Sequence, residues 1–307
     1  MKVEPKLIPI ALRDFTLPVP RTGSIEVNSG YGWAAAEGQE AHLRVQKKRT
    51  KSDPSYEPEV RISCSFDRER YRFQIDGRMD GIFRRDPPKI EEIKTSFNVH
   101  DLANRLSGNP MDHPYCLQLL TYGYFYWLHH KVLPRLTFHL VSTRSRESMD
   151  LECELNLSAY ERWLYRRLDE LVVEVRKAEK RVRSRKKIAA HFSFPFANPR
   201  PGQVEIAQTI EQGMNEGLPL LVQAPTGLGK TVGVLYPVLK DALSRGQQVI
   251  YVTPKNSQHS VAEDARQRFE EAGSKIKSLT ITIAANIEYL KSQEAQDRHT
   301  QKVFECS

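Results

Sequence analysis

The segment QAPTGLGKT, residues 223–231, decides how the second half of the chain folds. A short apolar run, LPLLVQA (218–224), leads into it, and TVGVLYPVLKDALSR (231–245) continues with helical spacing until Gly246. The next run, QQVIYVTP (247–254), has the β-branched and aromatic content of a strand. A strand, a glycine-rich loop, a helix and a second strand in this order predict a βαβ unit, and therefore a parallel sheet.

The loop follows the pattern G-x-x-x-x-G-K-[ST], with Ala224 at the first position. Glycines at 227 and 229 let backbone N–H groups approach a phosphate, because no Cβ stands in the way. The pattern assigns Lys230 to the β/γ-phosphates of ATP and Thr231 to Mg²⁺. The nucleotide-binding residues predicted in the loop are Ala224, Pro225, Thr226, Gly227, Gly229, Lys230 and Thr231.

Two flanking motifs narrow the type of protein. Gln203 lies upstream in RPGQVEIAQTI, and Thr253 ends the second predicted strand in VIYVTPKNSQ. With the loop, these motifs make residues 192–285 resemble the DinG and XPD branch of superfamily 2 DNA helicases. The resemblance implies that Gln203 reads adenine and that the segment after Thr253 touches the DNA backbone.

Members of that branch carry a four-cysteine iron–sulfur insertion, an Asp-Glu-x-His box and a second motor domain. No D-E-x-H follows residue 231, Cys306 stands alone, and residues 281–307 have no clear pattern. We therefore expect the front part of a motor, shortened by truncation, a frameshift or an expression boundary. Such a segment is expected to bind ATP without appreciable hydrolysis and without an iron–sulfur cluster.

The front half contains a predicted hairpin with charged residues. GRMDGIF (77–83) and EEIKTS (91–96) read as strands joined by the turn RRDPP. Glu92 and Lys94 are two residues apart and share one face, and the hairpin brings Asp80 close to them. Two neighbouring carboxylates repel each other, and Mg²⁺ or Mn²⁺ would relieve that repulsion. An ordinary exposed E-x-K pair is the alternative interpretation.

Two helical motifs accompany this hairpin. Gly38 and His42 lie on a helix predicted from Trp33 to about Lys48, and Gln118 and Tyr122 lie at i and i+4 on a helix predicted from Pro114. The four elements in this order resemble the RecB-type branch of the PD-(D/E)xK nucleases, over about residues 25–190.

That resemblance assigns roles to the individual residues. It implies that His42, Asp80 and Glu92 bind metal, that Asp80, Glu92 and Lys94 form the catalytic set, and that Gln118 and Tyr122 support the site and contact DNA. Met79 stands where the family has proline. Some relatives hold an iron–sulfur cluster, but Cys64, Cys116 and Cys153 are at the wrong places, so we expect none.

Together these patterns predict an α/β chain with two domains. Residues 1–190 are expected to form a restriction-endonuclease-like mixed sheet with flanking helices, ending in a long basic helix. Residues 191–200 are expected to be a proline-rich linker. Residues 201–307 are expected to form part of a RecA-like parallel α/β domain.

Charge and hydropathy limit the partners. The net charge is +8 and the sequence pI is about 9.2, which favours a polyanion such as DNA, single-stranded or with a free end. No apolar run is long enough to span a membrane and no signal peptide is evident, so a cytoplasmic protein is expected. A non-catalytic nucleic-acid- and nucleotide-binding remnant is the second hypothesis. A small-molecule kinase would explain the loop but not Gln203, Thr253 or the front motifs.

Overall fold

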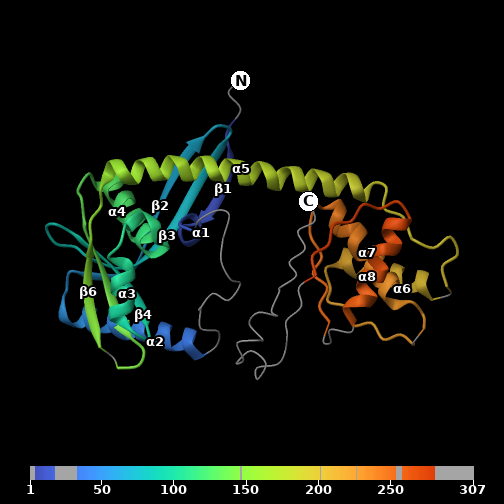
Figure 1. Ribbon diagram of the computed structural model, residues 1–307, viewed down its shortest axis with the longest axis horizontal. Helices are drawn as coiled ribbons and strands as arrows, with labels where there is room; N and C mark the ends of the chain where they lie inside the picture. The colour runs from blue at the N-terminus through green and yellow to red at the C-terminus, as the bar shows by residue number, and fades with distance from the viewer. Residues whose placement is uncertain are drawn as a thin grey trace, which may run out of the picture. The chain divides into compact units, whose positions relative to one another are not determined.

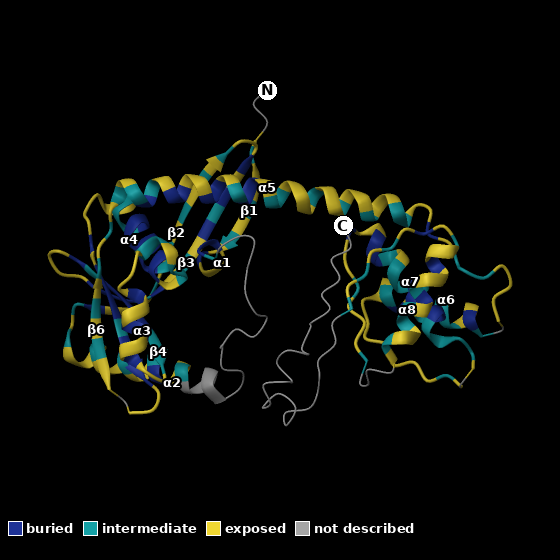
Figure 2. Cartoon of the chain, in the orientation of Figure 1, coloured by how far each residue is buried: buried dark blue, intermediate teal, exposed yellow. Residues whose placement is uncertain are grey.

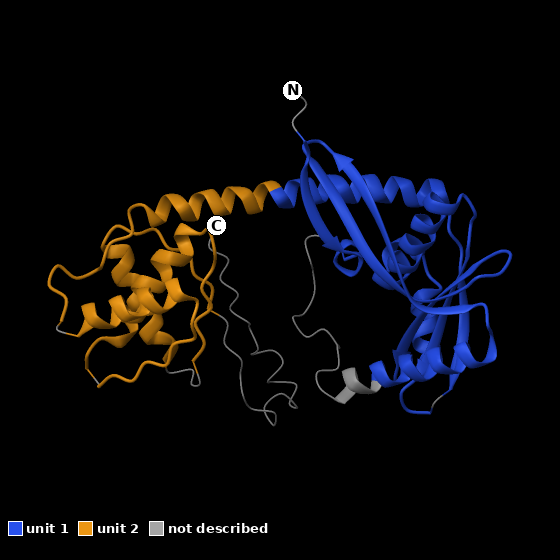
Figure 3. Cartoon of the chain, turned by 180° about the vertical axis from the view of Figure 1, so that it is seen from behind, with its two compact units in different colours: residues 1–175 blue, residues 176–307 orange. Residues whose placement is uncertain are grey.

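The computed structural model describes residues 4–17, 33–145, 147–200, 202–225, 227–253 and 258–280 (Figure 1). The chain divides into two compact units, residues 1–175 and residues 176–307 (Figure 3). We call them unit 1 and unit 2 and describe each separately. Thr226 and the patternless residues 281–307 lie outside the described part. No helix in the described part is both long and apolar enough to cross a membrane.

Unit 1 is built on a six-stranded mixed sheet with the order β1-β3-β4-β5-β6, in which β2 also pairs with β3. The strands β1 and β3 are parallel, as are β4 and β5, whereas the pairs β2–β3, β3–β4 and β5–β6 are antiparallel. The strand bounds are β1 Lys6–Ala11, β2 Tyr56–Arg68, β3 Tyr71–Phe83, β4 Lys89–Ser96, β5 Arg135–Ser142 and β6 Ser148–Cys153. The predicted mixed sheet with flanking helices is thus confirmed as an architecture.

Helices lie on both faces of this sheet. Adjacent residues of a strand point to opposite faces; Glu91 of β4 contacts a residue of α2, and Lys94 contacts a residue of α4. Buried residues line the strands and the inward sides of α4 and α5 (Figure 2). The helices are α1 Leu12–Phe15, α2 Trp33–Ser52, α3 Val99–Leu106, the 3₁₀ turn η1 Pro110–Asp112, α4 Pro114–His130 and α5 Leu157–Ala189.

The sequence did not predict β1, α1 or α3. Residues 1–30 read as turn-rich because the signal of β1 is not local: it forms by pairing in parallel with β3, from Lys6 beside Tyr71 to Ala11 beside Asp76. Arg167 of α5 then donates to the carbonyl of Phe15, which fixes α1 in the core. Long-range partners of this kind cannot be read from one short segment.

Unit 2 contains α6 Gln203–Glu216, α7 Lys230–Ser244 and α8 His259–Glu271. The two predicted strands are not formed: residues 218–225 and 247–253 are described without strand pairing. Leu221 and Ile250 are exposed rather than buried in a sheet. A strand needs neighbours for its backbone N–H and C=O groups, and the described part of unit 2 supplies none. Its apolar core is helical instead.

The division between the units lies at Val175 and Arg176, inside α5, whereas the sequence placed a linker at residues 191–200. The reason is that this segment packs. Phe192 is buried and its ring stacks on Tyr236 of α7 at 5.6 Å, and it meets Phe269 of α8 at 5.1 Å. Proline predicted the end of the helix correctly, but the phenylalanines around the first proline, Pro195, are part of the core of unit 2.

Candidate metal centre and nucleotide pocket

The charged hairpin of unit 1 opens where its two strands separate. β3 and β4 pair from Gly81 to Phe83 against Glu91 to Lys89 and then diverge. At this fork the carboxylate of Asp80 accepts a hydrogen bond from the backbone N–H of Ile93, with an oxygen–nitrogen distance of 2.7 Å. The side chain replaces the missing strand partner, so Asp80 is fixed beside the segment that carries Glu92.

Lys94 joins Glu92 to helix α4. Its Nζ donates to Oε1 of Glu92 at 2.7 Å and to Oε1 of Gln118 at 3.1 Å. Glu92 is only 2% exposed. Its second oxygen, Oε2, is buried and has no hydrogen-bond partner. A buried carboxylate oxygen without a partner is costly, which makes this atom a position where a ligand is expected.

Gln118 and Tyr122 tie Lys94 to β3, as their i, i+4 spacing predicted for one helix face. The Gln118 amide donates to the Tyr122 hydroxyl at 3.3 Å, and that hydroxyl donates to the carbonyl of Arg78 at 2.8 Å. Gly77 makes room for the ring, because a Cβ there would lie 2.8 Å from a ring carbon of Tyr122. The ammonium group of Lys94 is therefore held from both sides.

His42 approaches the fork from α2. Its Nδ1 lies 3.7 Å from Oδ1 of Asp80. One turn further along, the buried amide of Gln46 donates to the carbonyl of Asp80 at 2.9 Å and to Glu59 at 2.7 Å. A Cβ at Gly38 would stand 3.2 Å from the Thr95 hydroxyl, so a small residue lets this helix lie close to β4.

Burial controls the charges at this site. It raises the pKa of Glu92 to about 7; Lys94 opposes this increase, and the nearby Asp80 adds to it. Burial alone would lower the pKa of Lys94, but the charge and hydrogen bond of Glu92, with help from Asp80, raise it. Lys94 is therefore positively charged at neutral pH, whereas Glu92 gains or loses its proton near pH 7.

The predicted donor set offers oxygen and nitrogen ligands to a divalent cation, but among the described residues its ligand atoms do not all lie within 4.8 Å of one another. It contains Oδ1 of Asp80, the unpartnered Oε2 of Glu92 and Nδ1 of His42. Carboxylate oxygens are the preferred protein ligands of Mg²⁺ and Mn²⁺. A cation here would also relieve the repulsion that raises the pKa of Glu92.

The sequence interpretation missed a second charged cluster, on the opposite face of β4. Glu91 is fully buried, and its Oε2 accepts from Arg49 of α2 at 2.9 Å. Nδ1 of His139 lies 2.6 Å from Asp150, and single ligand atoms of Glu91, His139 and Asp150 lie within 4.8 Å of one another. One oxygen of Glu91 pairs with Arg49, and the other, Oε1, is buried without a hydrogen-bond partner, as Oε2 of Glu92 is; we assign this cluster to the docking of α2 because Arg49 belongs to that helix. The signal was the pair Glu91–Glu92, since adjacent strand residues must face opposite ways.

The glycine-rich loop of unit 2 leads directly into α7. Gly227 and Gly229 have φ angles of 82° and 77°, the left-handed region that other residues avoid. Nζ of Lys230 donates to the carbonyls of Ala224 at 3.0 Å and Pro225 at 2.8 Å. The lysine therefore folds back over the loop, toward the predicted phosphate position.

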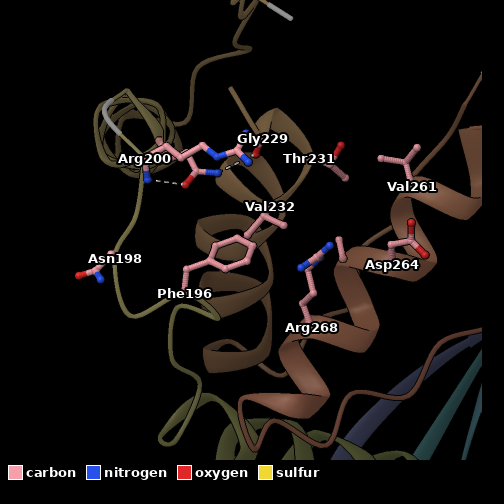
Figure 4. A pocket seen from close by; sticks show the side chains of 11 residues that line it. Phe196, Asn198, Arg200, Gly229, Thr231, Val232, Val261, Asp264 and Arg268 are labelled. Carbon is pink, nitrogen blue, oxygen red and sulfur yellow. Dashed lines mark hydrogen bonds between the residues drawn. The ribbon is translucent and has the colours of Figure 1, made fainter. Parts of the chain in front are cut away.

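A pocket of about 340 Å³ lies beside this loop, bounded by Phe196, Gln203, Thr231 and Arg268 among others (Figure 4). Gln203 accepts from the backbone N–H of Arg200 at 2.9 Å and donates to the carbonyl of Gly229 at 3.4 Å. The structure thus brings Gln203 to the loop, and its reading of adenine stays a prediction.

Thr253, by contrast, is half-buried at the end of segment 247–253, which is described without strand pairing, and it does not line this pocket. Of the predicted loop residues, Gly229 and Thr231 border the pocket, and Thr226 lies outside the described residues.

Among known protein families, a match was found for residues of unit 2. Residues 200–303 match the model of the DEAD/DEAH box helicase family. No curated protein matches the chain. A crystal structure of SSO0001 is similar with 19% identity and a TM-score of 0.40, covering 54% of this chain and 75% of that one. That likeness is too low to carry an argument.

This match supports a helicase module within residues 200–303, and such modules are typical of ATP-dependent proteins that act on nucleic acid. The family-model match lies within unit 2 and covers no part of unit 1.

Proposed function

We propose that the chain joins a metal-dependent DNA nuclease, unit 1, to the nucleotide-binding part of a DinG/XPD-like ATP-dependent DNA helicase in unit 2. The observation that carries the nuclease proposal is the buried, unpartnered oxygen of Glu92, beside Asp80, His42 and the ammonium group of Lys94. Such a protein would act on DNA that is single-stranded or has a free end, in the cytoplasm.

The side chains divide the work of phosphodiester hydrolysis. His42, Asp80 and Glu92 would hold the cation, which when bound polarises the phosphodiester and promotes ionisation of water. Lys94 orients the attacking water or stabilises the charge that develops on the phosphate oxygens. Gln118 and Tyr122 keep Lys94 in place through their hydrogen bonds.

In unit 2 the proposed roles follow the helicase motifs. Gln203 reads adenine, the loop and Lys230 bind the phosphates, Thr231 is a ligand of Mg²⁺, and the segment after Thr253 contacts DNA. A motor of this kind would feed a single strand to a cutting site, which gives a reason for joining the two units.

The test is cleavage of linear single-stranded DNA with Mg²⁺ or Mn²⁺ by the full chain. We expect Lys94→Ala to lower the rate by about 100- to 10,000-fold, since the site would lose a positioned charge next to the reacting groups. Lys230→Ala is the matched control, because it removes a lysine from the other unit and should leave cleavage unchanged. Equal rates for Lys94→Ala and wild type would overturn the proposal.

A non-catalytic nucleic-acid- and nucleotide-binding protein is the second candidate. The ion pair between Lys94 and Glu92 favours it, because the pair neutralises part of the site without any metal. Calorimetry with Mn²⁺ separates the two candidates. The nuclease proposal requires Mn²⁺ uptake that is lost in Asp80→Ala, whereas the second candidate requires no uptake at all.

A further inference from the structure

An exposed aromatic ring lies directly beside the candidate catalytic lysine. Tyr115, in the first turn of α4, is 40% exposed. Nζ of Lys94 lies 4.6 Å from the centre of its ring, and the ring of His113 lies 5.1 Å away, tilted by 58°. Tyr115 is not among the residues of the predicted metal site or its supporting helix face.

The surroundings hold this ring in one orientation while leaving part of its surface open. Lys94 contacts it from β4 and His113 from the residue before α4. His113 is itself fixed, since its Nδ1 accepts the backbone N–H of Tyr115 at 3.1 Å. Burial, with the nearby Arg105 and Lys94, lowers the pKa of His113, so its ring is neutral at pH 7. An aromatic side chain held in this way loses little entropy when a flat ligand stacks on it.

The position of the ring limits the ligand. Tyr115 and Gln118 are three residues apart on one face of α4, and Lys94 contacts both. A phosphate at the candidate metal centre would therefore leave the adjoining nucleoside within reach of the ring. Proteins that bind single strands commonly pair a cationic backbone contact with an aromatic platform for the base. A duplex cannot use such a platform, because its bases are already stacked on each other.

We propose that Tyr115 is a stacking platform for one unpaired base of single-stranded DNA, next to the phosphate bound near Lys94. This inference rests on the proposed nuclease function and names the form of its substrate. Tyr115 is thus a binding residue that fixes the position of the strand, and it takes no part in the bond-breaking step.

The test is binding of single-stranded oligothymidylate to the full chain in the presence of EDTA, which prevents metal-dependent cleavage. Loss of one stacked base weakens single-strand binding by about 5- to 100-fold, so Tyr115→Ala should raise Kd by that factor. Tyr115→Phe should keep the wild-type affinity, since the ring remains. Tyr165→Ala is the matched control. Tyr165 is 51% exposed on α5, with Arg68 5.9 Å from its ring centre, but it lies outside the site, so its loss should change nothing.

A second measurement separates stacking from a structural effect. Oligonucleotides with one 5-iodouracil should photocrosslink to Tyr115 in wild type and in Tyr165→Ala. Replacing the stacked nucleotide with an abasic one should weaken wild-type binding to the level of Tyr115→Ala, and should not weaken the variant further. A misfolded variant would lose binding to both oligonucleotides.

Two results would overturn the inference: equal affinity of Tyr115→Ala and wild type, or crosslinks confined to residues 176–307. Neither would decide the proposed nuclease function, which is measured with metal present. Cleavage that persists unchanged in Tyr115→Ala would leave that function standing without the platform. Stacking in EDTA combined with no Mn²⁺ uptake would leave the platform standing without the nuclease.

Discussion

Apolar segments of similar composition form a paired strand in unit 1 but not in the described part of unit 2. In unit 1, the apolar run of β5 found neighbours on both sides, β4 and β6, and Phe138 in its centre is fully buried. In unit 2, the equally apolar residues 218–225 are described without a paired neighbour, and Leu221 is fully exposed. Apolar alternation therefore predicts the capacity to form a strand, and the available neighbours decide whether the strand forms.

Helix starts differ in a parallel way. In unit 1, α3 and α4 are capped by side chains: Asn98 accepts two backbone N–H groups and His113 accepts one. In unit 2, α6 and α7 begin at left-handed glycines, Gly202 and Gly229, with no side-chain cap. The uncapped N–H groups of α7 lie where a phosphate is predicted to bind. The starts of α3 and α4 are thus satisfied by side chains of unit 1, whereas the start of α7 leaves donors for a ligand.

The largest expected effect comes from comparing a buried apolar side chain of unit 1 with an exposed one of unit 2. Phe125 is fully buried in unit 1, and Phe125→Ala should lower the free energy of unfolding of that unit by about 3–5 kcal/mol. Leu221→Ser in unit 2 should change stability by less than about 0.5 kcal/mol, because the residue is exposed. The three tryptophans, Trp33, Trp127 and Trp163, all precede Arg176, so their fluorescence reports the unfolding of unit 1 alone.

Hydrogen exchange of residues 218–225 completes this test. Fast exchange is expected for the backbone without strand pairing, except at Leu218, whose N–H donates to the carbonyl of Gly213. Slow exchange there, or a large loss of stability in Leu221→Ser, would mean that the segment pairs in solution and would break the contrast between the units.

The same contrast explains how much the sequence could foretell. The convergence of Asp80, Glu92 and Lys94 was predictable because a short hairpin and the two-residue period of a strand are local rules. The parallel pairing of β1 with β3 was not, since it joins distant segments. Nor was the role of Glu91, whose partner Arg49 belongs to another element. Local patterns thus predicted which charged side chains approach each other in unit 1, and the remaining contacts depend on tertiary structure.

Ligands offer the next test of the two sites. A ligand at about one hundred times its Kd stabilises the state that binds it by about 2.7 kcal/mol. We expect Mn²⁺ to stabilise unit 1 only, seen by tryptophan fluorescence, and ATP to stabilise unit 2 only, seen by hydrogen exchange of α7. Gly229→Ala should remove only the ATP effect, because a Cβ there would lie 2.2 Å from Nε2 of Gln203 on a left-handed backbone. Stabilisation of both units by one ligand would show that they are coupled.

The metal affinity of unit 1 should depend on pH in a defined direction. Burial raises the pKa of Glu92 to about 7, so the proton competes with the cation below that pH. Mn²⁺ affinity should therefore rise about tenfold per pH unit up to about pH 7 and level off above it. In the absence of metal, it is the stability of the folded state that depends on the ionisation of Glu92, and it changes with pH in the opposite direction. Because folding raises the pKa of this carboxyl, the folded state becomes less stable as pH rises from the pKa of the unfolded chain toward 7. Calorimetry at several pH values measures the first effect, and His42→Asn should retain it.

A pH-independent affinity between pH 5.5 and pH 8 would contradict the assignment of Glu92 as a ligand. Nucleotide binding by unit 2 provides an internal comparison in the same samples. It should lack the step near pH 7, because Glu92 belongs to the other unit.

The smallest expected effect concerns the helix starts. Asn98 accepts from the backbone N–H groups of His100 at 3.0 Å and Asp101 at 3.2 Å, so Asn98→Ala should lower the stability of unit 1 by about 1 kcal/mol. The matched change in unit 2 is Gln258→Ala, at the start of α8, where no side chain caps the helix. It should have no measurable effect on unit 2, because no capping bond is lost. Equal losses in the two variants would show that the helices of unit 2 depend on side-chain caps as much as those of unit 1, and the argument that unit 2 reserves its free donors for a ligand would then fail.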